Sequence, residues 1–482
     1  MAEERGTYAF AIEWLRMLGY SPDVRMAGVI ARYWGWYTAD NRWYHYRARR
    51  GFKLFRSDRE TLHPAALAAE AWSDLLMNEK LEIAAEDEGM REVLEAHFGN
   101  FGVAQADFTT RAFALGTGAW AIGVDDVSDD GMMHPDARVK IEDYDAHQVM
   151  PITWSADSCT QCAFVTRVEL GGRDYDQCQA HVLLDGTYHI LTQLFDVKSH
   201  HMVFPEGVTS DLDTRSPHKT FALVRPAVPN QHFSYCAMGA SVFDKGVSAI
   251  KATDEALTSL LAHLRVARPK MFVADELIEK KARRGADGKP LKGADGKPVT
   301  EYYAFGEADD IVFRTPPGPE GVDPLKVVQP DMRIADNERA INTGLKMLSI
   351  TCGLGDQYWA WDHKDGLKTA TEVVSDSSML ARTLRKHQNA LRGSIAELVR
   401  GVAGVCRHLC GTSVDPMAEM SIDFDDSIIT DTQTDKSMAL TEISVLGIPA
   451  LKRKYLRDWH NFSEDEALEA VPDQAAVLDP GF

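Results

Sequence analysis

The spacing of hydrophobic and polar residues changes along the chain. Residues 66–82 and 88–98 place apolar side chains at helical spacing, which predicts a mostly helical opening. From about residue 119 to 203 the pattern becomes short alternating runs separated by turns such as Asp185-Gly186, which predicts antiparallel strands. The runs are AWAIGV, VKIEDY, QVMPITW, CAFVTRVEL, QAHVLL and YHILTQLF. We therefore expect an α+β fold in which a helical part precedes a β-rich part.

Helical spacing returns in the second half of the chain. Apolar residues fall mainly on one face of a helix over 244–267, with Pro269 beyond its end, and again over 331–349. Between these helices the sequence GADGKPLK is repeated as GADGKP, and its Asp-Gly and Lys-Pro steps predict exposed turns. Thr369 and Glu372 form a capping-box pattern that opens a predicted helix reaching about residue 408. An acidic strand over 420–429 and further helices follow.

Length and charge limit the class of protein. At roughly 150 residues per domain, 482 residues correspond to about three domains or one elaborate subunit. The formal net charge is -20. A protein that grips duplex DNA neutralises phosphates with Lys and Arg, so this charge argues against a repressor, polymerase or nuclease.

The charge is unevenly distributed. Residues 1–60 hold 11 Lys/Arg against 7 Asp/Glu, and residues 265–300 hold 10 against 5, which leaves the remaining chain near -29. A strongly acidic body thus carries two basic segments. Chance clustering on a solvated surface is the alternative explanation for the first of them.

Cysteine use and hydropathy indicate a soluble protein made in the cytosol. No stretch approaches the roughly 18–20 consecutive apolar residues of a membrane helix, and the start of the chain lacks a signal-peptide layout. Seven cysteines are an odd number in a long chain, which argues against a disulfide framework. We expect reduced thiols.

Searches for catalytic motifs give one candidate. The chain contains no phosphate loop, dinucleotide fingerprint, HExxH or GxSxG motif. Cys159, Cys162, Cys178 and His181 have a spacing close to a Cys3His zinc site. The alternative is that these four residues lie on adjacent strands of the β-rich region without metal. A zinc-dependent hydrolase would need the metal and an open ligand position. The two hypotheses therefore predict different metal contents for the purified protein.

The order of parts resembles the portal proteins of tailed bacteriophages, in particular the siphophage-type portal family. The stretches that carry the resemblance are NEKLEI, VLEAHFGNFGVAQADFTTRAFALGTGAW, FVTRVEL, KTATEVVSDSS and SEDEALEAV. Their ordered agreement covers nearly the whole chain. The resemblance implies a wing over 1–243, stem helices over 244–267 and 331–349, and a small α/β clip over 268–330. It further implies a tunnel loop over 350–368, a long helix with a return to the wing over 369–433, and a helical crown over 434–482.

The same resemblance implies a function without catalysis or cofactors. Portal subunits form a ring, usually of twelve copies, at one capsid vertex, through which terminase pumps double-stranded DNA and from which DNA is later ejected. The large terminase subunit, head-completion or adaptor proteins, and the major capsid or scaffolding protein would be its partners. The ring would be assembled in the host cytoplasm and reside in the virion, without a membrane. A different ring-forming head-tail connector is an alternative, although connectors are typically shorter.

Two groups of residues would serve this function. The tunnel loop would present Trp359, Trp361, His363, Lys364 and Lys368 toward DNA, with the tryptophans either stacking on bases or anchoring the loop in a neighbouring surface. The clip would dock partner proteins through basic residues, because such a surface suits acidic partners. These are Lys280, Lys281, Arg283, Arg284, Lys289, Lys292 and Lys297.

Overall fold

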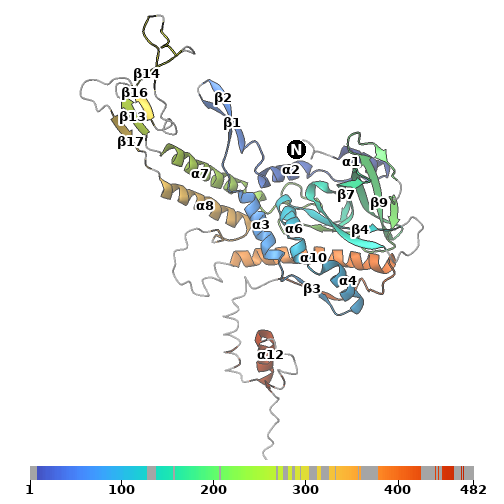
Figure 1. Cartoon of the computed structure of the whole chain (residues 1–482). Helices are drawn as coiled ribbons and strands as arrows, with labels where there is room; N and C mark the ends of the chain where they lie inside the picture. The colour runs from blue at the N-terminus through green and yellow to red at the C-terminus, as the bar shows by residue number, and fades with distance from the viewer. Residues whose placement is uncertain are drawn as a thin grey trace, which may run out of the picture. The chain divides into compact units, whose positions relative to one another are not determined.

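The computed structural model divides into two compact units. Unit 1 comprises Met1–Asn41, His63–Ser248 and Lys346–Phe482, and unit 2 comprises Arg42–Leu62 and Ala249–Leu345. The structure describes residues 8–50, 52–127, 137–155, 158–205, 208–267, 270–274, 280–284, 288–293, 295–302, 312–315, 325–329, 331, 333–356, 358–359, 378–424, 440, 443, 448–460, 468 and 470–471. Figure 1 shows the helices and strands along the chain.

A six-stranded antiparallel sheet forms the centre of unit 1. Its strands run in the order β10-β9-β8-β7-β6, with β11 also pairing to β9. Strands alternate side chains between two faces, and one face packs on helix α1 through Trp14, Leu15, Ala163, Cys178 and Val182. The bounds are β6 Val149–Ser155, β7 Ser158–Leu170, β8 Arg173–Leu184, β9 Thr187–Asp196, β10 Met202–Val203, β11 Asp211–Asp213 and α1 Ala9–Met17.

The opposite face of this sheet meets a second, three-stranded sheet. Phe164 of the large sheet stacks on Tyr144 at 4.7 Å and lies 5.8 Å from Phe221, measured between ring centroids. The second sheet has the order β12-β4-β5, with β4 Gly118–Asp125, β5 Arg138–Asp145 and β12 Phe221–Val224. Unit 1 therefore buries aromatic residues between two sheets.

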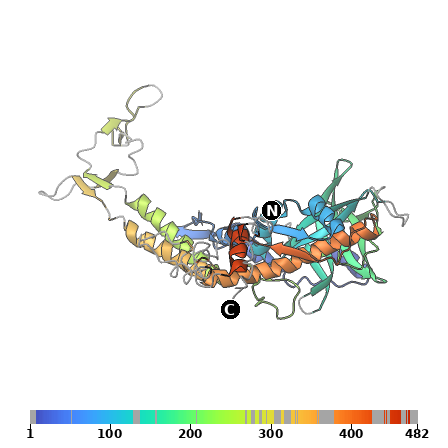
Figure 2. The same cartoon turned by 90° about the horizontal axis from the view of Figure 1, so that it is seen from below.

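A long helix supports the second sheet. Helix α10, Ser378–His408, contacts β4 and β12 as well as helices α3 and α4, and Figures 1 and 2 show it running beside these elements. Gly401 allows the close approach, since an added Cβ would lie 2.3 Å from the Lys219 carbonyl oxygen. The remaining elements of unit 1 include α2 Ala27–Tyr37, α3 Pro64–Leu76, β3 Glu82–Ala85, α4 Glu88–Phe98, α5 Phe101–Ala104, α6 Ala106–Leu115, β18 Met420–Asp423 (paired with β3) and α12 Pro449–His460; 3-10 turns span Ala146–Gln148 and Asp244–Gly246.

Unit 2 contains most of two antiparallel helices. Helix α7 spans Val247–Val266 and helix α8 spans Ile334–Cys352. Gly344 faces Thr253, where an added Cβ would lie 2.5 Å from the threonine hydroxyl oxygen, so the two backbones come close. Further along, Asn337 Nδ2 lies 2.9 Å from His263 Nδ1. From Thr253 to His263 the residue numbers on α7 rise, while those of their partners on α8 fall from Gly344 to Asn337, so the two helices are antiparallel.

Short strands complete unit 2. A three-stranded sheet has the order β16-β13-β17, with β13 Lys270–Ala274, β16 Val312–Thr315 and β17 Leu325–Val328, and β13 pairs parallel with β16. The strands β14 Lys280–Ala282 and β15 Thr300–Tyr302 form a separate pair. A third pair, β1 His45–Arg50 and β2 Lys53–Asp58, forms a hairpin.

The predicted α+β character and the strands of 119–203 are confirmed, as are the helices near 244–267 and 331–349. The helix predicted over 66–82 ends earlier, at Leu76, because Asn78 forms a turn in which the Lys80 N–H donates to its side chain at 3.0 Å. The prediction of a mostly helical opening is wrong for 45–58, which forms the hairpin of β1 and β2.

Within the described part of 268–330 the elements are strands, and an α/β clip stays a prediction. In the described residues no helix is long and apolar enough to cross a bilayer.

Candidate functional site

Helix α8 ends where the predicted tunnel loop begins, and the ending is fixed by backbone geometry. Gly353 adopts a left-handed conformation with φ 84°, and the Leu354 N–H donates to the Ser349 carbonyl at 2.8 Å. This is a Schellman ending, which glycine favours because it lacks a Cβ. The helix predicted over 331–349 thus continues to Cys352, three residues into the predicted tunnel loop.

Trp72 connects the two ends of the segment between α8 and α10. Its buried indole N–H donates to the Cys352 carbonyl at 3.1 Å, and its ring lies 4.5 Å from the ring of His387 on α10. An added Cβ on Gly353 would meet the Thr383 methyl carbon at 2.8 Å. The end of α8 therefore lies against the first turns of α10, with Trp72 contacting both.

Most of the predicted loop residues lie outside the described part of the chain. Trp361, His363, Lys364 and Lys368 are among these. Trp359 is described: it is half-buried, and its ring lies 5.3 Å from that of Tyr358 in an edge-on contact. Burial raises the pKa of Tyr358, so the phenol stays neutral over a wide pH range. The role of Trp359 toward DNA stays a prediction.

The basic residues of the predicted clip lie on two successive turns. Arg284 pairs with Pro290 and Lys292 pairs with Pro298 in isolated bridges, and each turn contains a glycine at positive φ, Gly288 and Gly296. Glycine adopts this conformation at little cost, which is why the repeated Asp-Gly step folds this way twice. Five basic side chains on these turns are exposed, namely Arg283, Arg284, Lys289, Lys292 and Lys297. Lys280 and Lys281 lie on β14, but their side chains are outside the described set.

The four candidate zinc ligands do not converge. Cys162 and His181 face each other in register between β7 and β8, and Cys178 lies three positions from His181 on β8, hence on the other face of the sheet. Cys178 packs in the core beside α1, whereas the His181 ring packs 5.2 Å from the Phe164 ring. In the described residues no group of three or more His, Cys, Asp or Glu could hold a metal ion. The structure does not assemble the Cys3His site.

His181 and the neighbouring thiols of Cys159 and Cys162 are buried, as residues of a hydrophobic core are. His181 Nδ1 lies 2.7 Å from the Thr220 hydroxyl, and burial lowers the pKa of its imidazole to about 3. The Cys159 pKa is lowered, chiefly because Cys162 hydrogen-bonds to it and with help from the positive charge of Lys219. The same contact and complete burial raise the pKa of Cys162. A neutral imidazole held among aromatic rings stabilises packing and gives no sign of acid-base work.

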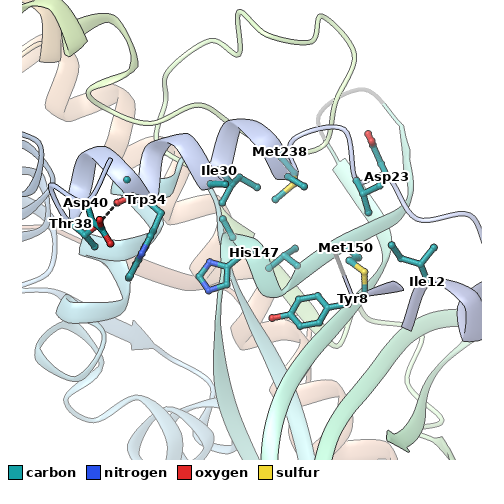
Figure 3. Close-up of a pocket in the computed structure, with 16 residues that line it drawn as sticks. Tyr8, Ile12, Asp23, Ile30, Trp34, Thr38, Asp40, His147, Met150 and Met238 are labelled. Carbon is teal, nitrogen blue, oxygen red and sulfur yellow. Dashed lines mark hydrogen bonds between the residues drawn. The ribbon is translucent and has the colours of Figure 1, made fainter. Parts of the chain in front are cut away.

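Unit 1 also contains an apolar cavity of about 500 Å³ between α1, α2 and the start of β6 (Figure 3). Ile12, Ile30, Met150 and Met238 contribute much of its wall, and Trp34 lies with its ring 6.0 Å from that of His147. Asp23 at its rim is held by Arg25 at 2.7 Å, which lowers the Asp23 pKa against the opposing effect of burial. The cavity could hold an apolar group, but its polar residues are already engaged with one another.

Sequence reasoning missed a surface that the structure places in unit 2. The hairpin of β1 and β2 carries Arg47, Arg56 and the exposed Phe52. The available signal was the alternation in HYRARR and KLFRSD on either side of Gly51, which marks two strands and a turn.

Comparisons with solved structures find chains of similar fold. No protein-family model matches the chain, and no curated protein does. A chain in the structure described as "Neck of native GTA particle computed with C12 symmetry" aligns with 96% of this chain and 99% of its own length, with 10% sequence identity and a TM-score of 0.40.

Proposed function

We propose that this chain is the subunit of a bacteriophage portal, a ring at one capsid vertex through which terminase packages DNA and through which DNA later leaves. The observation that carries the proposal is the order of elements. An antiparallel helix pair encloses short strands and basic turns, and a returning loop then leads into a helix of 31 residues. This is the order in which the sequence resembles portal proteins.

Exposed apolar side chains support assembly into a ring. On the helix pair, Leu264, Ile334, Met347 and Ile350 have exposed fractions of 41%, 40%, 47% and 46%. Clusters of exposed apolar residues on an otherwise globular chain mark interaction surfaces, because exposing them to water costs free energy. A closed head-to-tail ring would cover these side chains without leaving a free end.

The charge of the chain suits a conduit that DNA passes through. With -20 per copy, a ring of about twelve copies repels phosphate on average, so DNA is not trapped by counterion-releasing contacts. Sparse contacts from Lys364 and Lys368 would guide the duplex. In this proposal the wing spans 1–243, the two stem helices span 244–267 and 331–349, and the clip between them spans 268–330. The tunnel loop spans 350–368, the long helix with its return to the wing spans 369–433, and the crown spans 434–482. The subunit itself catalyses no reaction.

The central test is whether the purified chain forms hollow rings. We expect negative-stain electron microscopy and mass photometry to show a ring of about twelve copies. If the chain forms only monomers and dimers at concentrations of tens of micromolar, that result would contradict the proposal.

A deletion tests the docking role of the basic turns. The Arg283 N–H already donates to the Val299 carbonyl at 2.8 Å, so removing 285–298 joins neighbouring ends of the ladder. We expect rings of unchanged size and a loss of terminase binding of at least about tenfold, because the exposed positive charges are removed. Pull-down of purified terminase on rings measures this. Loss of the rings themselves would count against the assignment of this segment as a clip.

A further inference from the structure

The hairpin of β1 and β2 is a two-stranded sheet. Its strands pair only with each other among the described residues, from His45↔Asp58 to Arg50↔Lys53. Figure 1 shows it as a separate ribbon. An isolated two-stranded hairpin is marginally stable in water, because neither face is covered by a layer of structure. Something else must hold this one in place.

The base of the hairpin is held by helix α7. Asp254 is fully buried and accepts three hydrogen bonds, from the Tyr44 hydroxyl at 2.6 Å, the Thr61 hydroxyl at 2.8 Å and the Leu62 N–H at 2.9 Å. Arg59 donates to Glu255 at 2.8 Å and stacks over the ring of Trp43, 4.5 Å from its centroid. The hairpin is therefore fixed where it joins the helix, which lowers the entropy lost when it binds a partner.

The outer part of the hairpin exposes large apolar side chains. Phe52 is 98% exposed, Leu54 67% and Phe55 42%. Leu54 shares the face of Arg47 and Arg56, Phe55 lies on the other face, and Phe52 lies in the turn, so the end of the hairpin is apolar on both sides. A protein partner would cover these side chains. Polar contacts with phosphates would leave these side chains in water.

The charges of the hairpin work against its own stability. Arg47 stands directly opposite Arg56 on one face, and both are exposed. Asp58 lies 3.9 Å from Arg56, and this exposed ion pair offsets only part of the repulsion. Directly opposed like charges destabilise a strand pair. Residues 42–62 hold seven Lys/Arg and two Asp/Glu, a net +5, so the rest of the chain carries -25. A partner with an acidic surface would relieve the repulsion between the two arginines, and every other copy of this chain is such a partner.

We propose that the hairpin of β1 and β2 is a docking element that binds the acidic surface of the adjacent copy in the ring. Phe52, Leu54 and Phe55 pack on that copy, and Arg47 and Arg56 pair with its carboxylates. The inference rests on the proposed ring and adds the element that joins one subunit to the next. A head-to-tail ring suits it, since each copy then uses its hairpin on one neighbour and receives the hairpin of the other.

Charge reversal tests the proposal without changing the hairpin itself. Arg47→Glu with Arg56→Glu keeps two like charges opposite each other while the sign of the surface changes. It also removes the exposed ion pair of Arg56 with Asp58 at 3.9 Å, which contributes little to stability. We expect the concentration for half-assembly to rise at least about tenfold, with an unchanged circular dichroism spectrum. Phe52→Ser should act in the same direction. The matched control is Phe204→Ser, since Phe204 is 79% exposed in unit 1. Rings that form as readily as the wild type would overturn the inference.

Photocrosslinking identifies the partner directly. With p-benzoylphenylalanine in place of Phe52, illumination of assembled rings should give crosslinked dimers of the chain. Crosslinks to DNA in packaged particles, or none between copies, would overturn the inference. A wild-type chain that forms no rings at all would instead contradict the proposed portal function, so the two failures are distinguishable.

Discussion

Unit 1 buries its residues between layers, whereas unit 2 relies on a buried polar anchor and leaves apolar side chains in water. In unit 1 both faces of the large sheet are covered, with α1 on one and the second sheet on the other. In unit 2 the hairpin is anchored through Asp254, and Phe52 and Leu54 are exposed. Unit 1 also exposes Phe204, at 79%, so the difference between the units lies in the layers that cover the large sheet and in the buried carboxylate that anchors the two-stranded hairpin.

The largest expected effect concerns the polar anchor of unit 2. Asp254→Ala removes the carboxylate that accepts from the buried Tyr44 hydroxyl and from the partly buried Thr61 hydroxyl and Leu62 N–H. We expect the free energy of unfolding to fall by about 3–5 kcal/mol, because unsatisfied buried donors keep their desolvation cost. Urea unfolding measures the loss, and hydrogen exchange should show faster exchange within 42–62.

The neighbouring residue Glu255 provides the matched control for this anchor. Its side chain is 57% exposed and pairs with Arg59 at 2.8 Å. We expect Glu255→Ala to cost less than about 1 kcal/mol, since exposed ion pairs contribute little. Equal losses in the two variants would show that the buried carboxylate has no special part, and the contrast between the units would then rest on the layers that cover the large sheet alone.

Sequence patterns predicted unit 1 better than unit 2 for a physical reason. The strands from 119 to 195 alternate apolar and polar residues because one or both of their faces are buried, and that burial is written into the sequence. The hairpin strands HYRARR and KLFRSD are rich in charged residues and, among the side chains that the structure describes, have no buried face that repeats every second position. Their hydrophobic pattern is therefore weak, and the hairpin was missed.

The cysteine cluster shows a second limit of sequence reasoning. The spacing of Cys159, Cys162, Cys178 and His181 fits zinc, but spacing does not state which face of a strand each residue occupies. Cys178 and His181 are separated by an odd number of positions on a regular strand, so the sheet itself lies between them. Of the five candidate residues of the tunnel loop, only Trp359 falls within the described residues, and the sequence remains the basis for the other four.

A smaller effect tests whether the layered core makes unit 1 sensitive to acid. Burial lowers the pKa of His181 to about 3, well below the value of about 6.5 expected in the unfolded chain. Between these values the unfolded chain binds a proton that the folded chain does not, so stability is full above pH 6.5 and falls as the pH drops toward 3. The slope approaches about 1.4 kcal/mol per pH unit, which gives a loss of about 2 kcal/mol between pH 7 and pH 5.

We expect His181→Asn, which can keep the hydrogen bond to Thr220, to remove that loss in urea unfolding at the two pH values. Cys162, opposite it, does not titrate in this range, because its pKa is raised. Phe164→Leu is the control: it should lower stability at both pH values and leave their difference unchanged. If His181→Asn retains the full pH dependence, the acid sensitivity arises elsewhere and the layered core is not its source.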